Sequence, residues 1–324
     1  MIDDELLERV NAVPSSTKRL LLRSLYATAT AQRSLAERRL TRYNPPTPPR
    51  VIDADVVTLA RESDRLLLWR MLHTMLKYAG EPRSLHVVWD GAIRNETREL
   101  VENMASCIRV VSSRWAVENW PLPTVVRRFA ALHPFGRKLA VMLRPPAGRP
   151  YLYLDCDIAF FRGAWRLQRY LQDSDSPRYM LDGTSLGSYD LRMLPGLPLL
   201  PAVNAGFALV FDPLDWEVAL KRLAPYVQSA THVTEQTAFA IAMTTNRGKP
   251  LPISDFVLSW EDCDRPWDAY ATRDIVLRHY ASPILRWKLW LKGRPTGPRW
   301  IPYSYIASLA SSLRRASDHA GTAS

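Results

Sequence analysis

This chain has few cysteines and no long apolar run, and we expect no targeting segment. Its 324 residues include three cysteines, Cys107, Cys156 and Cys263, which is an odd number without a CxxC spacing. That pattern argues against a disulfide framework or a zinc site and suits a reducing cytosol. No apolar run approaches the roughly 18–20 residues of a membrane span. The acidic N-terminus MIDDELLERV does not fit a secretory signal, so we expect a globular cytoplasmic protein.

Acidic residues are too few to balance the basic ones, and the net charge is +11. An anionic partner is therefore expected, such as nucleotide phosphates, an acidic glycan or a membrane surface. Residues 16–43 carry seven basic residues and one acid, and residues 286–300 combine five basic residues with three tryptophans. Such stretches fit peripheral contact with an anionic membrane face. An ordinary amphipathic helix and a core-packed loop explain them equally well. Known nucleic-acid-binding modules are absent, so no nucleic-acid partner is expected.

A proline-rich segment, Asn44–Arg50 (NPPTPPR), marks the clearest boundary in the chain. We expect a helical extension and linker over residues 1–50, a catalytic domain over 51–300 and a C-terminal helix or tail over 301–324. Beyond the boundary, apolar strand patterns alternate with helical patterns. This alternation predicts an α/β fold with a mostly parallel sheet in an αβα sandwich. Expected strands cover residues 55–60, 85–89, 108–111, 151–154, 179–181 and 205–211, and expected helices cover 65–78, 95–105, 125–143 (broken near 133–136), 214–227 and 235–243.

The most informative segment is YLYLDCDIAFF, residues 151–161. An apolar strand ends in two carboxylates, Asp155 and Asp157, whose spacing places both on one face while Cys156 points away. Apolar residues on both sides force the acids to be partly desolvated, and an unpaired buried carboxylate is costly. A bound magnesium or manganese ion would relieve that cost, because both ions take oxygen ligands shared with phosphates. The segment therefore predicts a divalent cation site.

Four further short motifs accompany this pair in chain order. HPFGRKLA lies upstream, and VNAG, TEQTA and VLRHYASPILRWKLW follow downstream. Glycine in VNAG permits close approach of a backbone to a ligand. The chemistry-bearing residues of the four motifs are Arg137 and Lys138; Asn204, Ala205 and Gly206; Glu235 and Gln236; and His279 and Lys288.

This ordered series resembles the GT-A glycosyltransferases, most closely glycosyltransferase family eight. The resemblance implies a nucleotide-binding αβα sandwich that moves a hexose from a nucleotide sugar, chiefly a UDP-hexose, with Mn²⁺ or Mg²⁺ as cofactor. The acceptor would be a glycan, a lipid-linked saccharide or a protein, and transfer would retain anomeric configuration.

The resemblance also implies a role for each matching residue. Asp155, Asp157 and His279 would ligate the metal. Glu235 and Gln236 would lie beneath the anomeric carbon and act with Asp157 as the catalytic residues. The implied donor-binding residues are Asp155, Arg137 or Lys138, Asn204, Ala205, Gly206 and Lys288.

Two departures from the family pattern leave other readings open. The acid–amide pair is EQ rather than DQ, and the lysine motif is KLW without the usual preceding glycine. An inactive donor-binding homologue is one alternative. A haloacid-dehalogenase-like phosphatase with Asp155 as nucleophile is the other, although about 100 residues of strand–helix alternation precede this aspartate pair.

Overall fold

The structure, a computed structural model, divides the described chain into two compact units. The larger unit contains the described residues up to 258 together with 274–279, and the smaller contains the others from 259 onward. Each unit is described by itself. The structure describes residues 50–143, 150–172, 176–182, 189–259, 262, 268–271, 273–281 and 283–290.

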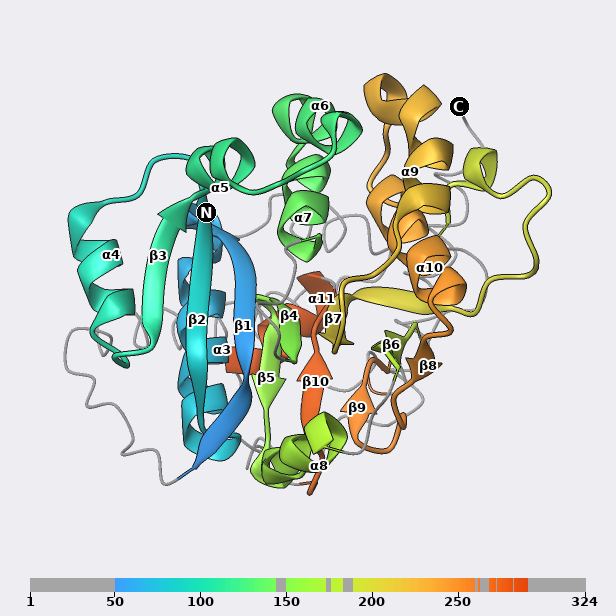
Figure 1. The fold of residues 1–324 in the computed structure, drawn as a ribbon. Helices are drawn as coiled ribbons and strands as arrows, with labels where there is room; N and C mark the ends of the chain where they lie inside the picture. Colours follow the sequence, from blue (N-terminus) through green and yellow to red (C-terminus); the bar gives the residue numbers. More distant parts are fainter. Residues whose placement is uncertain are drawn as a thin grey trace, which may run out of the picture. The chain divides into compact units, whose positions relative to one another are not determined.

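A seven-stranded sheet runs through the larger unit in the order β3-β2-β1-β4-β7-β6-β8 (Figure 1). Strands β1 to β4 are mutually parallel, and β7 is antiparallel to its neighbours β4 and β6. The fold is therefore mixed α/β with a mostly parallel sheet, as the alternation predicts. The strands are β1 (Val51–Arg61), β2 (Glu81–Asp90), β3 (Ile108–Ser112), β4 (Tyr151–Asp155), β6 (Arg178–Leu181), β7 (Val203–Val210) and β8 (Lys249–Pro250).

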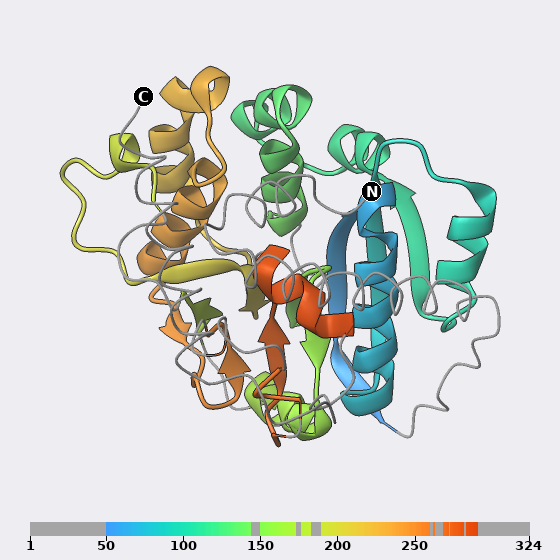
Figure 2. The same cartoon turned by 180° about the vertical axis from the view of Figure 1, so that it is seen from behind.

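Helices cover both faces of this sheet. Tyr151 and Tyr153 of β4 are buried in one core cluster with residues of the helices α5, α6, α7, α9 and α10. The alternate residues Leu152 and Leu154 are also buried, and strand geometry directs them to the opposite face. Helix α3 lies on that opposite side (Figures 1 and 2). The helices are α3 (Arg65–Tyr78), α4 (Asn95–Glu102), α5 (Ser113–Asn119), α6 (Thr124–Leu132), α7 (Pro134–Met142), α8 (Leu167–Gln172), α9 (Glu217–Leu223) and α10 (Thr234–Thr245).

The expected helix over residues 125–143 is two helices, with the break where it was predicted. Helix α6 ends at Leu132 and α7 begins at Pro134, since proline suits a first helical position and disfavours a helix interior. The two helices lie so close that a Cβ on Gly136 would be 2.2 Å from the backbone carbon of Phe129. This crossing orients α7, which carries Arg137 and Lys138.

A second, three-stranded sheet was not predicted from the sequence. It consists of β5 (Ile158–Phe160), β10 (Leu277–His279) and β9 (Phe256–Val257), with β10 in the centre. Strand β10 pairs antiparallel with β5, and His279 lies opposite Ile158. The backbone N–H of Phe160 donates to Oγ1 of Thr74, 3.1 Å away, which ties this sheet to α3. The pairing therefore brings residue 279 next to the end of the aspartate motif.

The smaller unit contains α11 (Pro283–Arg286) and a short 3₁₀ helix, Trp287–Trp290. Oδ2 of Asp262 accepts a hydrogen bond from the backbone N–H of Ala269 at 2.9 Å. The expected helical extension and the C-terminal tail lie outside the described residues, as does Cys263. Cys107 and Cys156 are free thiols. In the part of the chain that the structure describes, no helix is both long and apolar enough to cross a bilayer.

Candidate active site

The two motif aspartates lie at the carboxyl end of β4. The strand ends at Asp155, and Asp157 lies in the turn that leads into β5. Asp157 is buried and Asp155 is partly buried, as the flanking apolar residues predict. The Cys156 thiol points away from both acids and donates to the carbonyl of Leu59 at 2.9 Å. A tight turn, rather than continued strand alternation, thus directs both carboxylates to one side.

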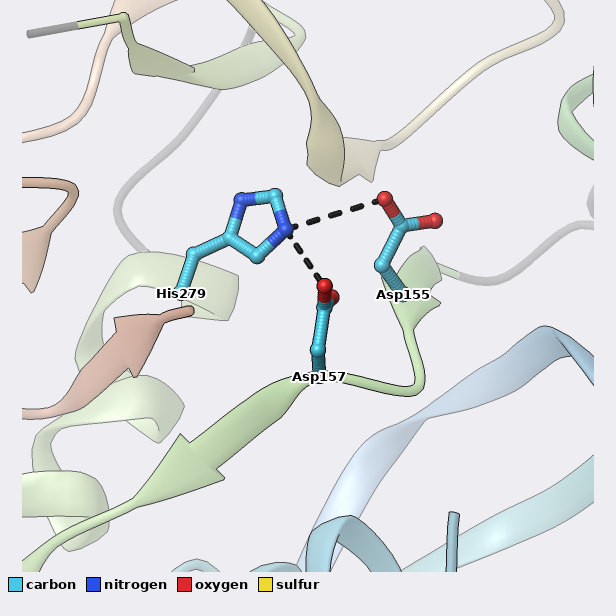
Figure 3. A group of neighbouring side chains, drawn as sticks. All are labelled: Asp155, Asp157 and His279. Atoms are coloured by element: carbon cyan, nitrogen blue, oxygen red, sulfur yellow. Dashed lines mark hydrogen bonds and ion pairs between the residues drawn. The ribbon is translucent and has the colours of Figure 1, made fainter. Parts of the chain in front are cut away.

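His279 completes a cluster with these two acids (Figure 3). Its Nε2 is 3.0 Å from Oδ1 of Asp157 and 3.8 Å from Oδ2 of Asp155. One ligand atom from each of the three residues lies within 4.8 Å of the others. The imidazole is 3% exposed. The β5–β10 pairing therefore joins residues more than 120 positions apart into one group with the spacing of metal ligands.

Strand β7 supports the histidine from the other side. The side-chain Oδ1 of Asn204 is 2.9 Å from Nδ1 of His279 and accepts a hydrogen bond from the backbone N–H of Gly206 at 2.9 Å. The register of β7 against β6 is irregular at this point, since Tyr179 pairs with Ala208 and Met180 already pairs with Asn204. Such irregularities re-aim side chains beside functional sites. Asn204, Ala205 and Gly206 are all buried on β7.

Lys138 is the upstream cation that reaches the cluster. Its Nζ is 3.0 Å from Oδ2 of Asp155 and 3.0 Å from Oε1 of Glu235. Burial disfavours the charged amine, but the two carboxylates outweigh this effect and raise the pKa of Lys138 above its ordinary value. Arg137 instead contacts Asp90, with Nε 2.7 Å from Oδ1. The sequence could not decide whether Arg137 or Lys138 lies at the site. In the structure, Lys138 is the one that forms an ion pair with the aspartate motif.

Glu235 and Gln236 lie in the first turn of α10. Glu235 is buried and Gln236 is half-buried. The turn is anchored by Thr234, whose hydroxyl donates to Oδ2 of the buried Asp190 at 2.7 Å. The backbone N–H of Asp190 in turn donates to Oγ1 of Thr237 at 2.7 Å. These bonds fix Glu235 where it pairs with Lys138, so a chain of contacts links the acid of the EQ motif to Asp155.

Tyr153 is a site residue that the sequence analysis missed. Its hydroxyl donates to Oδ1 of Asp155 at 2.5 Å, and Nζ of Lys138 lies 5.8 Å from its ring centroid. Burial, together with the nearby Asp155 carboxylate, raises the pKa of Tyr153 well above its ordinary value, so the phenol stays neutral. The alternation of Tyr151, Tyr153 and Asp155 on one strand face was the signal that could have identified it.

Lys288 belongs to the smaller unit. Its amine is buried, donates to the backbone carbonyl of Asp262 and lies 3.1 Å from Oδ1 of the same residue. Contact with a donor diphosphate would require release from this buried pair, which costs free energy. The assignment of Lys288 to donor binding stays a prediction.

The geometry does not favour a phosphatase with Asp155 as nucleophile. Each carboxylate oxygen of Asp155 already has a donor, Tyr153 at Oδ1 and Lys138 at Oδ2. Two carboxylates and one imidazole instead match the ligands that proteins offer to a divalent ion. The cluster can thus hold a cation that also binds phosphate oxygens.

No protein-family model matches the chain, and no curated protein matches its sequence. Solved structures that resemble it include the galactosyltransferase LgtC in complex with donor and acceptor sugar analogs, at 15% identity and a TM-score of 0.47, covering 80% of this chain and 96% of LgtC. Mouse xyloside xylosyltransferase 1 is 12% identical with a TM-score of 0.43, covering 70% of this chain and 97% of that one. The glycosyltransferase GlyE of Streptococcus pneumoniae TIGR4 is 11% identical with a TM-score of 0.42, covering 81% of this chain and 64% of GlyE. All three are named as glycosyltransferases.

Proposed function

We propose that this protein is a metal-dependent GT-A glycosyltransferase that moves a hexose from a nucleotide sugar, chiefly a UDP-hexose, to an acceptor. The observation that carries the proposal is the convergence of Asp155, Asp157 and His279, within 4.8 Å, at the carboxyl end of a parallel strand. Ligands of open α/β sheets bind at that end of the strands. The residues that converge are the ones that the family-eight motif series marks.

The three side chains fit a manganese or magnesium ion. Two carboxylates suit both ions, and the imidazole nitrogen favours the transition metal, so manganese is the better match. Asp155, Asp157 and His279 would hold the ion. When bound, it would act as a Lewis acid that offsets the charge on the departing nucleoside diphosphate.

The protein's own groups complete the electrostatic arrangement. Lys138, whose amine already lies on Asp155 and Glu235, supplies a fixed positive charge beside the diphosphate. Glu235 and Gln236, on the first turn of α10, face the side of the sugar where positive charge develops at the anomeric carbon. Ala205 and Gly206 let the backbone of β7 approach the sugar closely. By the family resemblance, transfer retains configuration and the leaving phosphate takes the acceptor's proton.

The acceptor is a glycan, a lipid-linked saccharide or a protein. The excess of basic residues supports action at an anionic membrane face from the cytoplasmic side. Nucleic acid is not among the proposed partners.

The test is a panel of UDP-, GDP- and other nucleotide sugars, scored for release of the nucleoside diphosphate with Mn²⁺, Mg²⁺ or a chelator. We expect slow hydrolysis of one donor, faster with Mn²⁺ and lost with chelator. Asp157→Asn should abolish it with the fold intact. Asp212→Asn, which alters an exposed aspartate just after β7, is the matched control and should leave it unchanged.

The alternatives give different results in the same assay. A phosphatase would hydrolyse simple phosphate esters without a nucleotide sugar. An inactive homologue would release no nucleotide, although a donor with metal would raise its melting temperature. Hydrolysis that is insensitive to both chelator and Asp157→Asn would overturn the metal assignment.

A further inference from the structure

The side chain of Asn204 has a defined orientation, because one of its two contacts can only be a donor. The backbone N–H of Gly206 lies 2.9 Å from the side-chain atom Oδ1. A backbone N–H needs an acceptor, so the atom facing it is the oxygen and not the amide nitrogen. The same oxygen is 2.9 Å from Nδ1 of His279. Nδ1 must therefore carry a hydrogen and donate it.

The hydrogen on Nδ1 determines what Nε2 offers. In the neutral ring, Nε2 then presents its lone pair. That lone pair faces Oδ1 of Asp157 at 3.0 Å and Oδ2 of Asp155 at 3.8 Å. The lone pair and the two carboxylate oxygens together form the kind of donor set that a divalent cation binds. The orientation of Asn204 thus prepares His279 as a ligand before any ion arrives.

We propose that Asn204 is a positioning residue that holds His279 in the ligand tautomer and orientation, rather than chiefly a contact to the donor sugar. This inference rests on the cation site of the proposed function. Residues that bond the second nitrogen of a ligating histidine tune metal affinity, and losing one typically costs about 10- to 100-fold. Both side chains are almost fully buried, Asn204 at 5% and His279 at 3% exposure, so water cannot readily replace the amide.

Neighbouring features of β7 serve the same contact. The irregular register around Asn204 turns its oxygen toward both Gly206 and His279. Gly206 leaves room for the ring, because a Cβ there would be 2.5 Å from Nδ1. Asn204 and Gly206 of the NAG segment therefore both contact the His279 imidazole. The backbone N–H of Gly206 fixes the orientation of the Asn204 side chain.

The test compares Asn204→Leu with Asn204→Asp in full-length protein. Leucine removes the acceptor at similar volume, whereas aspartate keeps an acceptor for both donors, replaces the amide NH₂ with a second oxygen and adds a negative charge. Mn²⁺ affinity is measured without donor, from the free-ion electron paramagnetic resonance signal. We expect Asn204→Leu to bind Mn²⁺ about 10- to 100-fold more weakly and Asn204→Asp to bind it at least as tightly as wild type.

Two further measurements separate positioning from general damage. Asn246→Leu removes an asparagine whose amide bonds the carbonyls of Asp215 and Ala242, and it should leave Mn²⁺ affinity unchanged. The visible absorption of bound Co²⁺ should match wild type in Asn204→Asp and differ in Asn204→Leu. If Asn204→Leu does not fold, Asn204→Ala takes its place.

The outcomes distinguish this inference from the proposed function. Wild-type protein that binds no Mn²⁺ would overturn the cation site and the inference together. Wild-type binding with equal affinity in Asn204→Leu would overturn the inference and leave the site standing. Equal losses in Asn204→Leu and Asn204→Asp would show that keeping the acceptor does not preserve Mn²⁺ binding, and would also contradict the inference.

Discussion

At the scale of single residues, the site depends on how closely the His279 ring approaches Gly206. A Cβ at position 206 would lie 2.2 Å from Cε1 of the ring, well inside van der Waals contact. His279 cannot move away without losing the contacts of Nδ1 with Asn204 and of Nε2 with Asp157. Glycine is therefore required here for space, not for backbone conformation.

Gly206→Ala should displace His279 and weaken Mn²⁺ binding by about 5- to 150-fold, since overpacking a close-fitting site costs about 1–3 kcal/mol. Mn²⁺ titration of the purified variant measures the effect. Gly196→Ala is the matched control, because Gly196 is exposed with φ at +76°. That substitution should cost stability through backbone strain and spare metal binding. Equal Mn²⁺ affinity in wild type and Gly206→Ala would contradict the packing argument.

Lys138→Met should destabilise the fold by about 3 kcal/mol, because removing one partner of a buried ion pair leaves the other charge uncompensated. Of the two carboxylates left behind, Asp155 and Glu235, the more deeply buried is Glu235, at 4% side-chain exposure. Adding Glu235→Gln to Lys138→Met removes that charge, so the double variant should be more stable than Lys138→Met. Urea unfolding of the three proteins measures this. If the double variant were no more stable than Lys138→Met, the unpaired Glu235 carboxylate would not be the cause of the destabilisation.

The grouping of Asp155, Asp157 and His279 could be predicted because their motifs carry their own chemistry. Asp155 and Asp157 follow an apolar strand, and His279 has its place in the motif order. The contact of Asn204 with His279 could not be predicted. It depends on a strand irregularity and joins residues 75 positions apart. Lys138 could be separated from Arg137 only once the direction of α7 was known.

At the scale of elements, helix α3 carries a histidine that the site does not use. His73 is half-buried and stacks on Trp69 with ring centroids 5.3 Å apart. Burial, with the nearby Lys77 and Arg70, lowers the pKa of His73 to about 4 from 6.5. The folded protein therefore keeps this ring neutral where an unfolded chain would protonate it.

Stability should fall as the pH drops from 6.5 toward 4, because only the unfolded state gains this proton in that window. Above pH 6.5 His73 is neutral in both states and does not lower the free energy of unfolding. Below pH 4 both states are protonated, so the free energy of unfolding falls no further on account of His73. We expect protonation of His73 to lower the free energy of unfolding by about 2 kcal/mol across this window, allowing for solvent screening of a half-buried ring. The free energy of unfolding of His73→Gln, measured from pH 7 to 4.5, should decline less than that of wild type. If the free energies of unfolding of wild type and His73→Gln fell equally with pH, His73 would not be the group that causes the loss of stability.

Long elements and several strands of four or five residues were predictable, but strands of two or three residues were not. Strand β1 and helix α3 have clear periodicity over 11 and 14 residues. Strands β5, β9 and β10 have two or three residues each, too few for a period to be visible. The pairing of β5 with β10 joins residues more than 100 positions apart. Two of the elements that sequence analysis missed, β5 and β10, are therefore the ones that deliver His279.

At the scale of the whole molecule, the net charge of +11 implies attraction to anionic surfaces. The protein should co-sediment with vesicles containing phosphatidylserine and not with purely neutral vesicles. The bound fraction should fall steeply between 0.05 and about 0.5 M salt, because screening shortens the range of the attraction. Equal binding to neutral vesicles, or none to anionic ones at low salt, would contradict peripheral membrane contact.

The central claim is that Asp155, Asp157 and His279 hold one divalent cation together with a nucleoside diphosphate. The most direct measurement is anomalous diffraction at the manganese edge from crystals grown with Mn²⁺ and UDP. The account predicts one strong peak within coordination distance of Oδ2 of Asp155, Oδ1 of Asp157 and Nε2 of His279, with diphosphate oxygens completing the shell. Diphosphate bound with no manganese at these atoms, or manganese only elsewhere, would contradict it.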